Sequence, residues 1–346
     1  MFLATTAVEE FWDTNQQKIL LAGEWCRLYK KEYFVETECL PFIWDNAEKV
    51  FEAQQYCNKI YESVLVFLTD SLNDYFGINQ ETHYYRILLG NWLIHFIHQA
   101  YDKYKIFDFA KTLGDISTWT LEREQYYYPF DFTDFSKELD NDLYQLQLFS
   151  EVARYLEIGN FTKKIGSPLE ETKKKNLPTN TQKIKRQIKL ELNNAFKNVS
   201  NFVNPKKKVI IVNPYFKRSS SRLILLFWLK SFGKFTFDEF QYSLKNTKKN
   251  IDLDFRRKEI KTTNSFSSWI PKFALFNIPL CYLEYHTEYT KLIEGLYPNK
   301  GNCFFTYNAL YYNTPFQFFL ANRYKDQVIT SAQHGCAYGM DERHEG

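Results

Sequence analysis

The sequence predicts an α/β protein whose parallel sheet is interrupted by a large helical insertion. Short apolar runs end in small or polar residues, as buried parallel strands do. From residue 208 onward, strand and helix patterns alternate at the spacing of βαβ units, which implies a right-handed parallel sheet. Long stretches with helical spacing of apolar residues separate the first strands from the last ones.

Three extended segments open the chain. MFLATT at 1–6 and KILLAGEW at 18–25 are apolar runs of strand length, and a polar, acidic turn separates them. CLPFIWDN at 39–46 resembles a third extended piece, with Pro41 marking its edge.

Long helical patterns follow these segments. The first, over 45–77, repeats apolar residues at three- and four-residue spacing, with Asp45 as the predicted N-cap and Gly77 as its end. The second, over 82–110, is apolar around most of its circumference, which predicts burial on several sides. A less regular section then leads to a third helix over 136–157.

The rest of the chain divides into a basic linker and a βαβ segment. We therefore predict three regions, 1–160, 161–207 and 208–346, of which the last completes the sheet begun by the first. The helices expected after residue 160 cover 181–199, 278–296 and 313–324, and a loop followed by a helix is expected over 217–233. Strands are expected over 208–216 and 302–309, and a strand that runs into a loop over 327–335.

The linker carries the strongest local charge. Between Lys163 and Lys208 there are 13 Lys and Arg residues against three acids, in a chain whose net charge is only +3. Such a stretch attracts anionic lipid, nucleic acid or a phosphorylated substrate, whereas its Pro, Thr and Asn content is typical of a solvated linker. Because the whole chain is not strongly basic, nucleic-acid binding is the weakest of these readings.

Composition excludes several other classes. The six cysteines form no C-x-x-C pair, so no zinc or redox spacing is present. The first residues lack the features of a signal peptide, and the longest wholly apolar run, LILLFWL at 223–229, is far too short to span a membrane. We expect a cytoplasmic protein, with peripheral contact at the inner membrane face only through surface charge.

Residues that follow the predicted strands are the candidate site residues, because ligands of open α/β sheets bind beyond the carboxyl ends of the strands. Thr6 and Glu24 follow the first two strands, Asn213 follows the first strand of the last region, and His334 ends the final one. If these strands share one sheet, the four groups converge on one edge.

His334 is the sharpest candidate. Histidine carries a proton most readily near neutral pH, and Gly335 and Gly339 let the backbone N–H groups approach a phosphate closely. A histidine that caps a turn is the equal alternative.

Arginines and one acid complete the candidate set. Arg218 and Arg222 flank three serines after NPYF, a composition that suits an anion cradle or equally a solvated loop with a Ser N-cap. Arg86 lies in a mostly apolar helix and needs a partner if buried, an anionic ligand being one option. Glu24 is the best candidate base, and a structural hydrogen-bonded Glu is the alternative.

Four segments taken together resemble a known family. MFLATTAVEEFWD, ILLAGEWCRLY, HYYRILLGNWLIHFIHQAYDKY and ITSAQHGCAYG look like segments that recur in this order in transferases encoded in bacterial O-antigen and other surface-polysaccharide clusters. The resemblance runs from residue 1 to residue 339. This chain departs in QHGCAYG, where a second glycine is commoner, and in GNWL, which replaces GPWL.

The resemblance implies a glycosyltransferase with two Rossmann-like domains, the GT-B architecture. The acceptor would bind mainly to the first domain and the donor nucleotide to the second, with His334 and Gly335 at the cleft and with Glu24 and Arg86 at motif positions. The family continues for about another domain after the QHG loop. We therefore expect this chain to be the acceptor-side half, inactive alone and dependent on a C-terminal domain or partner chain.

Three functions follow from these readings. In the first, a sugar passes from a nucleotide-activated donor, with a CMP-linked acidic sugar as one option, to a surface-glycan acceptor. Glu24 would deprotonate the acceptor hydroxyl while His334 and Arg222 stabilise the departing phosphate, with no metal or cofactor. The second is a non-catalytic binding module that docks a partner through an exposed apolar surface. The third is salt-dependent nucleic-acid binding through the linker.

Overall fold

The computed structural model divides into two compact units. Unit 1 comprises Met1–Thr82, Leu89–Lys174 and Asn250–Glu284, and unit 2 comprises His83–Leu88, Lys175–Lys249 and Tyr285–Gly346. The residues that the structure describes are 1–16, 18–28, 37–163, 209–212, 233–236, 250–258, 263, 265–293, 303–306, 309–326 and 328–331. The segment 250–284 belongs to unit 1 although it lies between two strands of unit 2 in the sequence.

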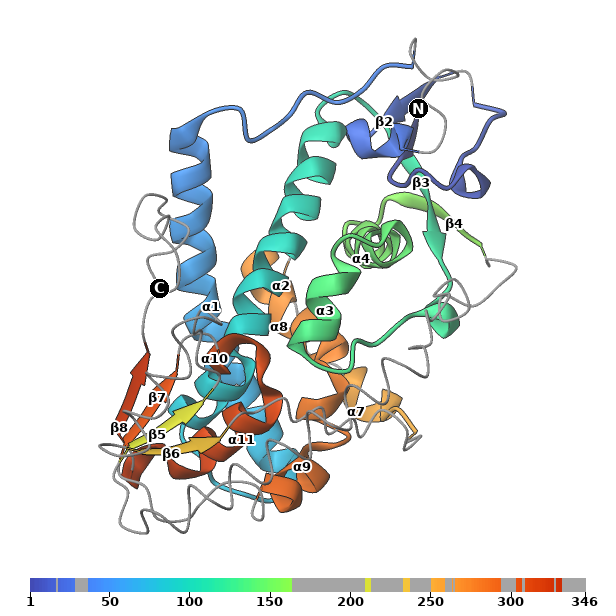
Figure 1. Cartoon of the computed structure of the whole chain (residues 1–346). Coiled ribbons are helices and arrows are strands. Elements are labelled where there is room, and N and C mark those ends of the chain that lie inside the picture. Colours follow the sequence, from blue (N-terminus) through green and yellow to red (C-terminus); the bar gives the residue numbers. More distant parts are fainter. Residues whose placement is uncertain are drawn as a thin grey trace, which may run out of the picture. The chain divides into compact units, whose positions relative to one another are not determined.

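Unit 1 contains a four-stranded parallel sheet (Figure 1). Its strands are β1 (Phe2–Ala4), β2 (Ile19–Leu21), β3 (Ser117–Leu121) and β4 (Gly159–Lys163), in the order β2-β1-β3-β4. In the central strand, Phe2 pairs with residue 19 on one side and residue 117 on the other. All three residues of β1 are buried, as expected for a parallel strand covered on both faces.

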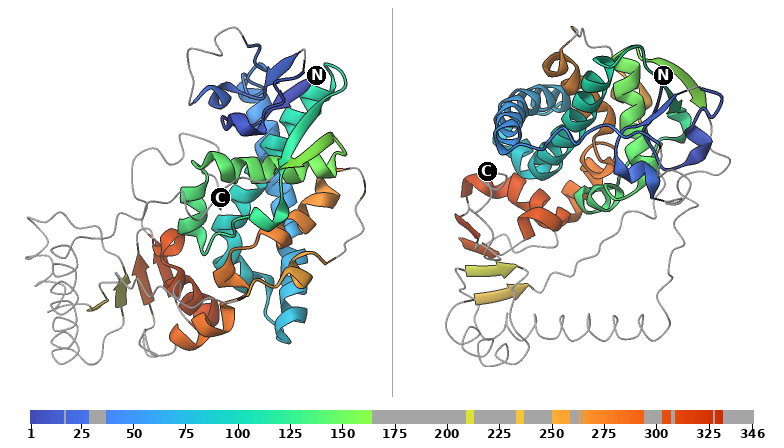
Figure 2. Two further views of the ribbon diagram at one scale, coloured as in Figure 1. Left: turned by 90° about the vertical axis from the view of Figure 1, so that its right-hand side faces the viewer. Right: turned by 90° about the horizontal axis from the view of Figure 1, so that it is seen from above.

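Unit 2 contains a second four-stranded parallel sheet, drawn from yellow to red in Figure 2. Its strands are β5 (Val209–Val212), β6 (Gly233–Thr236), β7 (Cys303–Thr306) and β8 (Val328–Ser331), in the order β6-β5-β7-β8. Counted within each unit, both sheets therefore have the strand order 2-1-3-4.

The α/β class and the parallel strands are confirmed, but the expectation of one sheet is wrong. Among the described residues, the late strands form a sheet of their own rather than completing the first one. The physical reason is that unit 1 completes its sheet with β3 and β4, which the sequence analysis did not predict. The boundaries predicted after residues 160 and 207 stay a prediction, because 164–208 lie outside the described residues.

Two thirty-residue helices follow the first strands, close to where they were predicted. In α1 (Ala47–Phe76) the N-cap is Asn46, whose side chain accepts the Glu48 N–H, so the predicted cap at Asp45 is wrong by one residue. Gly77 ends α1 in the left-handed region at φ 63°, which favours glycine. The second helix, α2, spans Thr82–Lys111. None of the helices in the described part of the chain is long and apolar enough to cross a bilayer.

The section between α2 and β4 differs from its prediction. The less regular section contains β3 and the start of α3 (Phe132–Glu138), and the third helix is divided into α3 and α4 (Asp142–Tyr155). The strand β3 was unexpected because it alternates Thr with larger residues, yet Thr118 is buried and its hydroxyl donates to Leu3 O at 2.8 Å.

The remaining elements are short. They are α7 (Leu253–Arg256), α8 (Phe266–Asn277), α9 (His286–Ile293), α10 (Ala309–Tyr312) and α11 (Thr314–Arg323), with 3-10 turns η1 (Glu9–Phe11), η2 (Glu24–Arg27), η3 (Arg123–Gln125), η5 (Leu280–Tyr282) and η6 (Tyr324–Asp326). A strand is confirmed within each of the predicted ranges 302–309 and 327–335, as is the helix at 313–324, whereas 278–296 is only partly α-helical. The loop predicted after β8 lies outside the described residues. The helices predicted at 181–199 and 217–233 lie outside the described residues.

A buried ion pair fixes the 250–284 segment within unit 1. The guanidinium of Arg256, fully buried, donates through Nε and Nη2 to both carboxylate oxygens of Glu284 at 2.7 Å. Its Nη1 donates to the carbonyl oxygens of Phe276 and Ile278, and its carbon Cζ lies 4.8 Å from the centroid of the Tyr128 ring. This side chain therefore holds residues 256, 276, 278 and 284 of the 250–284 segment together and, through Tyr128, contacts the 89–174 segment of unit 1.

Replacement of this arginine is therefore expected to be costly. Arg256→Leu leaves the Glu284 carboxylate buried without its partner, so we expect the free energy of unfolding to fall by about 3–5 kcal/mol in urea titrations. The double variant Arg256→Leu/Glu284→Leu is expected to recover part of the loss, because no unpaired charge remains buried. Arg257→Leu, at an exposed neighbouring position, is the matched control. A double variant less stable than the single one would contradict this account.

Candidate active site at the carboxyl edge of the unit 1 sheet

The strand order of unit 1 defines where a ligand is expected. The chain leaves β1 toward β2 on one side and later returns to β3 on the other, so the topology switches between β1 and β3. Open α/β sheets bind ligands at such a switch, beyond the carboxyl ends of the strands. The segments that follow β1, β2 and β3 therefore form the candidate site.

The turn after β1 is held by the first residue of α4. The Thr6 hydroxyl donates to Asp142 Oδ2 at 2.6 Å, and the Ala7 N–H donates to the same oxygen at 3.0 Å. Thr6 Oγ1 also accepts the Val8 N–H, and the Thr6 carbonyl accepts the indole N–H of Trp12. Thr6 is fully buried, and its polar groups bond to the protein itself.

Burial controls the ionisation of Asp142. It raises the pKa of this carboxyl, although hydrogen bonds from Thr6, Ala7 and Val8 favour the ionised form and oppose part of the shift. The carboxylate lies in the first turn of α4, where the helix dipole favours negative charge. The Asp142 contact therefore ties β1 to α4 but keeps a charged group partly desolvated.

The segment after β2 presents an aromatic ring. Trp25 donates its indole N–H to Thr5 O at 3.2 Å, and its ring is stacked on Phe149 of α4 with centroids 6.1 Å apart. The neighbouring Cys26 thiol donates to Ala4 O at 3.2 Å, and burial raises its pKa. Trp25 remains 40% exposed while Cys26 is buried.

Glu24 precedes this ring and is the most accessible acid of the site. Its side chain is 72% exposed, and both carboxylate oxygens lie 2.6 Å from Arg27 Nη1. The Arg27 Nη2 atom donates to Thr37 O. The carboxylate is thus solvent-accessible and held by one guanidinium.

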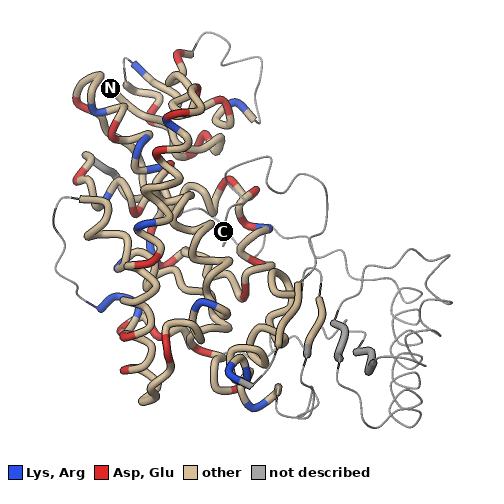
Figure 3. The backbone as a smooth tube through the Cα atoms, turned by 90° about the vertical axis from the view of Figure 1, so that its left-hand side faces the viewer, with Lys and Arg blue, Asp and Glu red and all other residues tan. Residues whose placement is uncertain are grey.

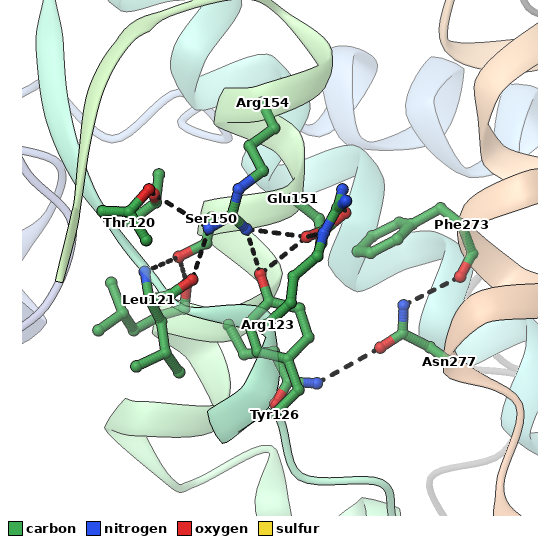
Figure 4. Close-up of polar contacts among 12 residues, drawn as sticks. Thr120, Leu121, Arg123, Tyr126, Ser150, Glu151, Arg154, Phe273 and Asn277 are labelled. Atoms are coloured by element: carbon green, nitrogen blue, oxygen red, sulfur yellow. Dashed lines mark hydrogen bonds and ion pairs between the residues drawn. The ribbon is translucent and has the colours of Figure 1, made fainter. Parts of the chain in front are cut away.

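The segment after β3 meets a polar face of α4 (Figure 4). This face, which we name the α4 polar stripe, consists of Gln147, Ser150, Glu151 and Arg154. Ser150 Oγ accepts the Leu121 N–H at 2.9 Å, and Gln147 bonds the N–H and the carbonyl of Tyr127. The α4 polar stripe therefore supplies hydrogen bonds to the end of β3 and the segment after it, where no neighbouring strand of the described chain supplies them.

Two arginines, Arg154 of this stripe and Arg123 of η3, bind the stripe's glutamate (Figure 4). Arg123 donates through Nε and Nη2 to the two oxygens of Glu151 at 2.8 Å, and Arg154 Nη1 donates to Glu151 Oε1 at 2.8 Å. The Tyr126 hydroxyl donates to the same Oε1, and Arg154 Nη2 donates to Leu121 O. Two positive charges therefore face one negative charge, and the Arg123 side chain is 44% exposed.

The pKa of Glu151 follows from these contacts. Burial by itself raises it, but the hydrogen bond and charge of Arg123, the charge of Arg154 and the Tyr126 hydroxyl outweigh burial and hold the pKa below its usual value. Burial and the nearby Glu151 charge raise the pKa of Tyr126 well above its usual value. The cluster is therefore ionised as a carboxylate with two guanidiniums at neutral pH.

The structure brings two of the predicted site residues to this edge. Thr6 and Glu24 follow adjacent strands of the unit 1 sheet, Thr6 buried and Glu24 exposed. Arg86 lies in the part of α2 that belongs to unit 2 and is half-buried. The other predicted site residues lie outside the described residues: Arg218, Arg222, His334, Gly335 and Gly339. The expectation that all these residues lie at one edge depended on a single sheet, and the described strands form two sheets.

Sequence reasoning missed the residues that organise this edge. Asp142 has a weak signal, since it follows the N-cap Asn141, whereas the α4 polar stripe gives none, because polar residues in a helix are normally assigned to the solvent side. Two D-x-D spacings, Asp140 with Asp142 and Asp252 with Asp254, were also missed. In the structure Asp252 caps α7 through the Phe255 N–H and accepts the Tyr75 hydroxyl.

Comparison with known proteins gives one assignment. A family model described as LIC12162 family transferase matches residues 1–345. The chain belongs to this family. No curated protein and no solved structure matches the chain significantly. The expected membership of a transferase family is thus confirmed for this LIC12162 family member, whereas the glycosyltransferase assignment and the O-antigen context stay predictions.

Asp142 offers a test of the contact between β1 and α4. Asp142→Asn keeps an oxygen acceptor and removes a partly desolvated charge, so we expect a free energy of unfolding equal to or above that of the unchanged protein at pH 7. Asp142→Ala removes the acceptor and is expected to cost about 1–3 kcal/mol. Because the folded pKa is raised, the advantage of Asn should shrink as pH falls through that pKa toward 3.8. Equal losses in both variants would contradict the role given to burial.

Glu151 offers a test with the opposite pH dependence. Glu151→Gln leaves two guanidiniums without a carboxylate, and we expect a loss of about 3–5 kcal/mol at pH 7. The folded pKa of Glu151 is lowered, so its contribution is complete above 4.5 and disappears as pH falls through the folded pKa. Thermal unfolding between pH 3 and pH 7 should show the variant and the unchanged protein converging in acid. Glu124→Gln, at an exposed position, is the control.

Proposed function

We propose that this LIC12162 family transferase moves a glycosyl group from a nucleotide-activated sugar to a hydroxyl of a glycan acceptor. The observation that carries the proposal is the repeated strand order 2-1-3-4 in two wholly parallel sheets. Each order has a switch point of the kind that binds ligands. A transfer reaction needs places for two substrates, and two Rossmann-like sheets in one chain supply two such edges.

In this proposal the carboxyl edge of unit 1 binds the acceptor. The accessible groups there are the Glu24 carboxylate, the Trp25 ring and the Arg123 guanidinium. Neutral and acidic sugars offer hydroxyl and carboxylate groups that such side chains recognise. The donor, with a CMP-linked acidic sugar as one option, is assigned to unit 2. The presence of this second parallel sheet favours a chain that binds both substrates over the expected acceptor-side half that is inactive alone.

The proposed chemistry is displacement at the anomeric carbon of the donor. The acceptor oxygen forms a bond to that carbon, the bond from the carbon to the phosphate oxygen breaks, and the nucleotide leaves with the electron pair. The Glu24 carboxylate takes the proton of the acceptor hydroxyl. The hydroxyl competes with Arg27 for this carboxylate. His334 and Arg222, supported by Arg218, Gly335 and Gly339, are proposed to stabilise the departing phosphate.

The stretch between Lys163 and Lys208 gives nucleic-acid binding no further support. Only Lys163 of this stretch is described, and its Nζ donates to Glu10 O and lies 4.4 Å from the centroid of the Trp119 ring. Elsewhere in the described chain, basic and acidic residues are interspersed (Figure 3). Acidic side chains beside basic ones weaken attraction to a phosphate backbone.

Turnover of labelled donors tests the proposal. CMP-, UDP- and GDP-sugars are incubated with the chain and with surface-glycan acceptors, and release of nucleotide together with labelled glycan is measured. Glu24→Gln is expected to reduce turnover roughly 10²–10⁴-fold, because a proton acceptor is lost. Glu38→Gln, which alters another exposed carboxylate in an ion pair, should leave it unchanged. Glycan binding without turnover of any donor would favour a non-catalytic binding module instead.

A further inference from the structure

Trp25 combines a fixed ring position with partial exposure. Its indole N–H, the only polar group of the ring, donates inward to Thr5 O at 3.2 Å. The residue as a whole is 40% exposed, and with its N–H directed inward the ring has only carbon atoms to offer a ligand. Water molecules cannot form hydrogen bonds to ring carbon, so this surface favours contact with the apolar face of another ring over contact with water.

Gly23 shows that this position of the ring is built into the sequence. A Cβ atom at Gly23 would lie 1.9 Å from Trp25 Cζ3 and 2.3 Å from Cη2, so the ring packs directly over the glycine backbone. The Gly23 φ of 179° is extended backbone that any residue adopts. A side chain at Gly23 would therefore displace the ring of Trp25, whereas the backbone conformation at this position excludes no residue.

Phe149 supports the ring from α4. The two ring planes are inclined by 24° with centroids 6.1 Å apart. The Lys103 ammonium lies 5.2 Å from the centroid of Phe149, so the support is itself packed. A ring held by a hydrogen bond, a glycine and a stacked phenyl group loses little conformational entropy when a ligand stacks on it.

We propose that the exposed ring of Trp25 is a stacking platform for a pyranose ring of the acceptor glycan. This inference rests on the proposed function, since it gives the substrate class for the edge assigned to the acceptor. A pyranose presents C–H groups on its faces and hydroxyls at its rim, and aromatic rings with nearby polar groups suit that pattern.

The charge beside the platform favours a sugar over a nucleobase. Glu24 is the next residue, and its exposed carboxylate accepts hydrogen bonds from hydroxyls but repels the phosphates that accompany a base in a nucleotide. Arg27 balances this charge without exceeding it. The edge of β2 is therefore suited to an uncharged polyol.

Saturation-transfer difference NMR on the full chain tests the platform without requiring turnover. The probes are the methyl β-glycosides of glucose, galactose and N-acetylglucosamine, with CMP and UMP as the competing ligand class. We expect transfer to the glycoside ring protons and a fall in affinity of roughly tenfold or more in Trp25→Ala, with partial retention in Trp25→Phe.

Two further variants sharpen the test. Gly23→Ala keeps the tryptophan but displaces its ring, so it should weaken glycoside binding as Trp25→Ala does. Phe51→Ala in α1 removes another aromatic residue that is 40% exposed and should leave binding unchanged. Circular dichroism confirms that each variant is folded before binding is compared.

The outcomes separate this inference from the proposed function. Absence of glycoside binding to the unchanged protein, or equal binding by Trp25→Ala, overturns the platform even if donor turnover is found. Loss of nucleotide binding rather than glycoside binding in Trp25→Ala also overturns it and assigns the ring to a base. Loss of glycoside binding with no donor turnover supports the platform and contradicts the transferase chemistry.

Discussion

The carboxyl ends of β1 and β3 leave backbone groups that their neighbouring strands do not pair, and α4 satisfies them. Asp142 binds the turn after β1, while the α4 polar stripe bonds the N–H and carbonyl groups of residues 121 and 127. Buried backbone groups without partners are costly, so this one helix determines whether the edge of the sheet can exist in its present form. Two of the accessible side chains at that edge contact this helix directly: the Trp25 ring packs on Phe149, and the Arg123 guanidinium binds Glu151.

This arrangement divides the edge into a closed part and an open part. Thr6, Asp142 and Glu151 bond to other protein groups and serve the fold, whereas Glu24, Trp25 and Arg123 combine a fixed position with exposure. Preorganised groups at a topological switch are what a binding site requires, because little ordering remains to be done when a ligand arrives. Substrate binding and proton transfer are therefore assigned only to the exposed groups of this edge.

The sequence predicts this fold where local patterns are strong. The helical spacing in 82–110 and the glycine at 77 located long helices closely, and the apolar runs at 1–6 and 18–25 located two strands. Prediction from the sequence fails where polar side chains point into the protein. The hydroxyl of Thr118 bonds a neighbouring strand and the α4 polar stripe bonds backbone, so hydrophobic patterning assigned a strand to a loop. Of the site, Glu24 could be placed at a strand end, but its ion pair with Arg27 could not.

The segment 250–284 also sets an order of events during synthesis. Unit 1 begins with the first residue, yet Arg256 and Glu284, which close its core, emerge from the ribosome only after β5 and β6 of unit 2. Domains generally fold as soon as their residues are available. Until residue 284 is made, the Arg256 guanidinium has no Glu284 carboxylate to bind. The core of unit 1 therefore cannot close before the last segment of that unit is synthesised.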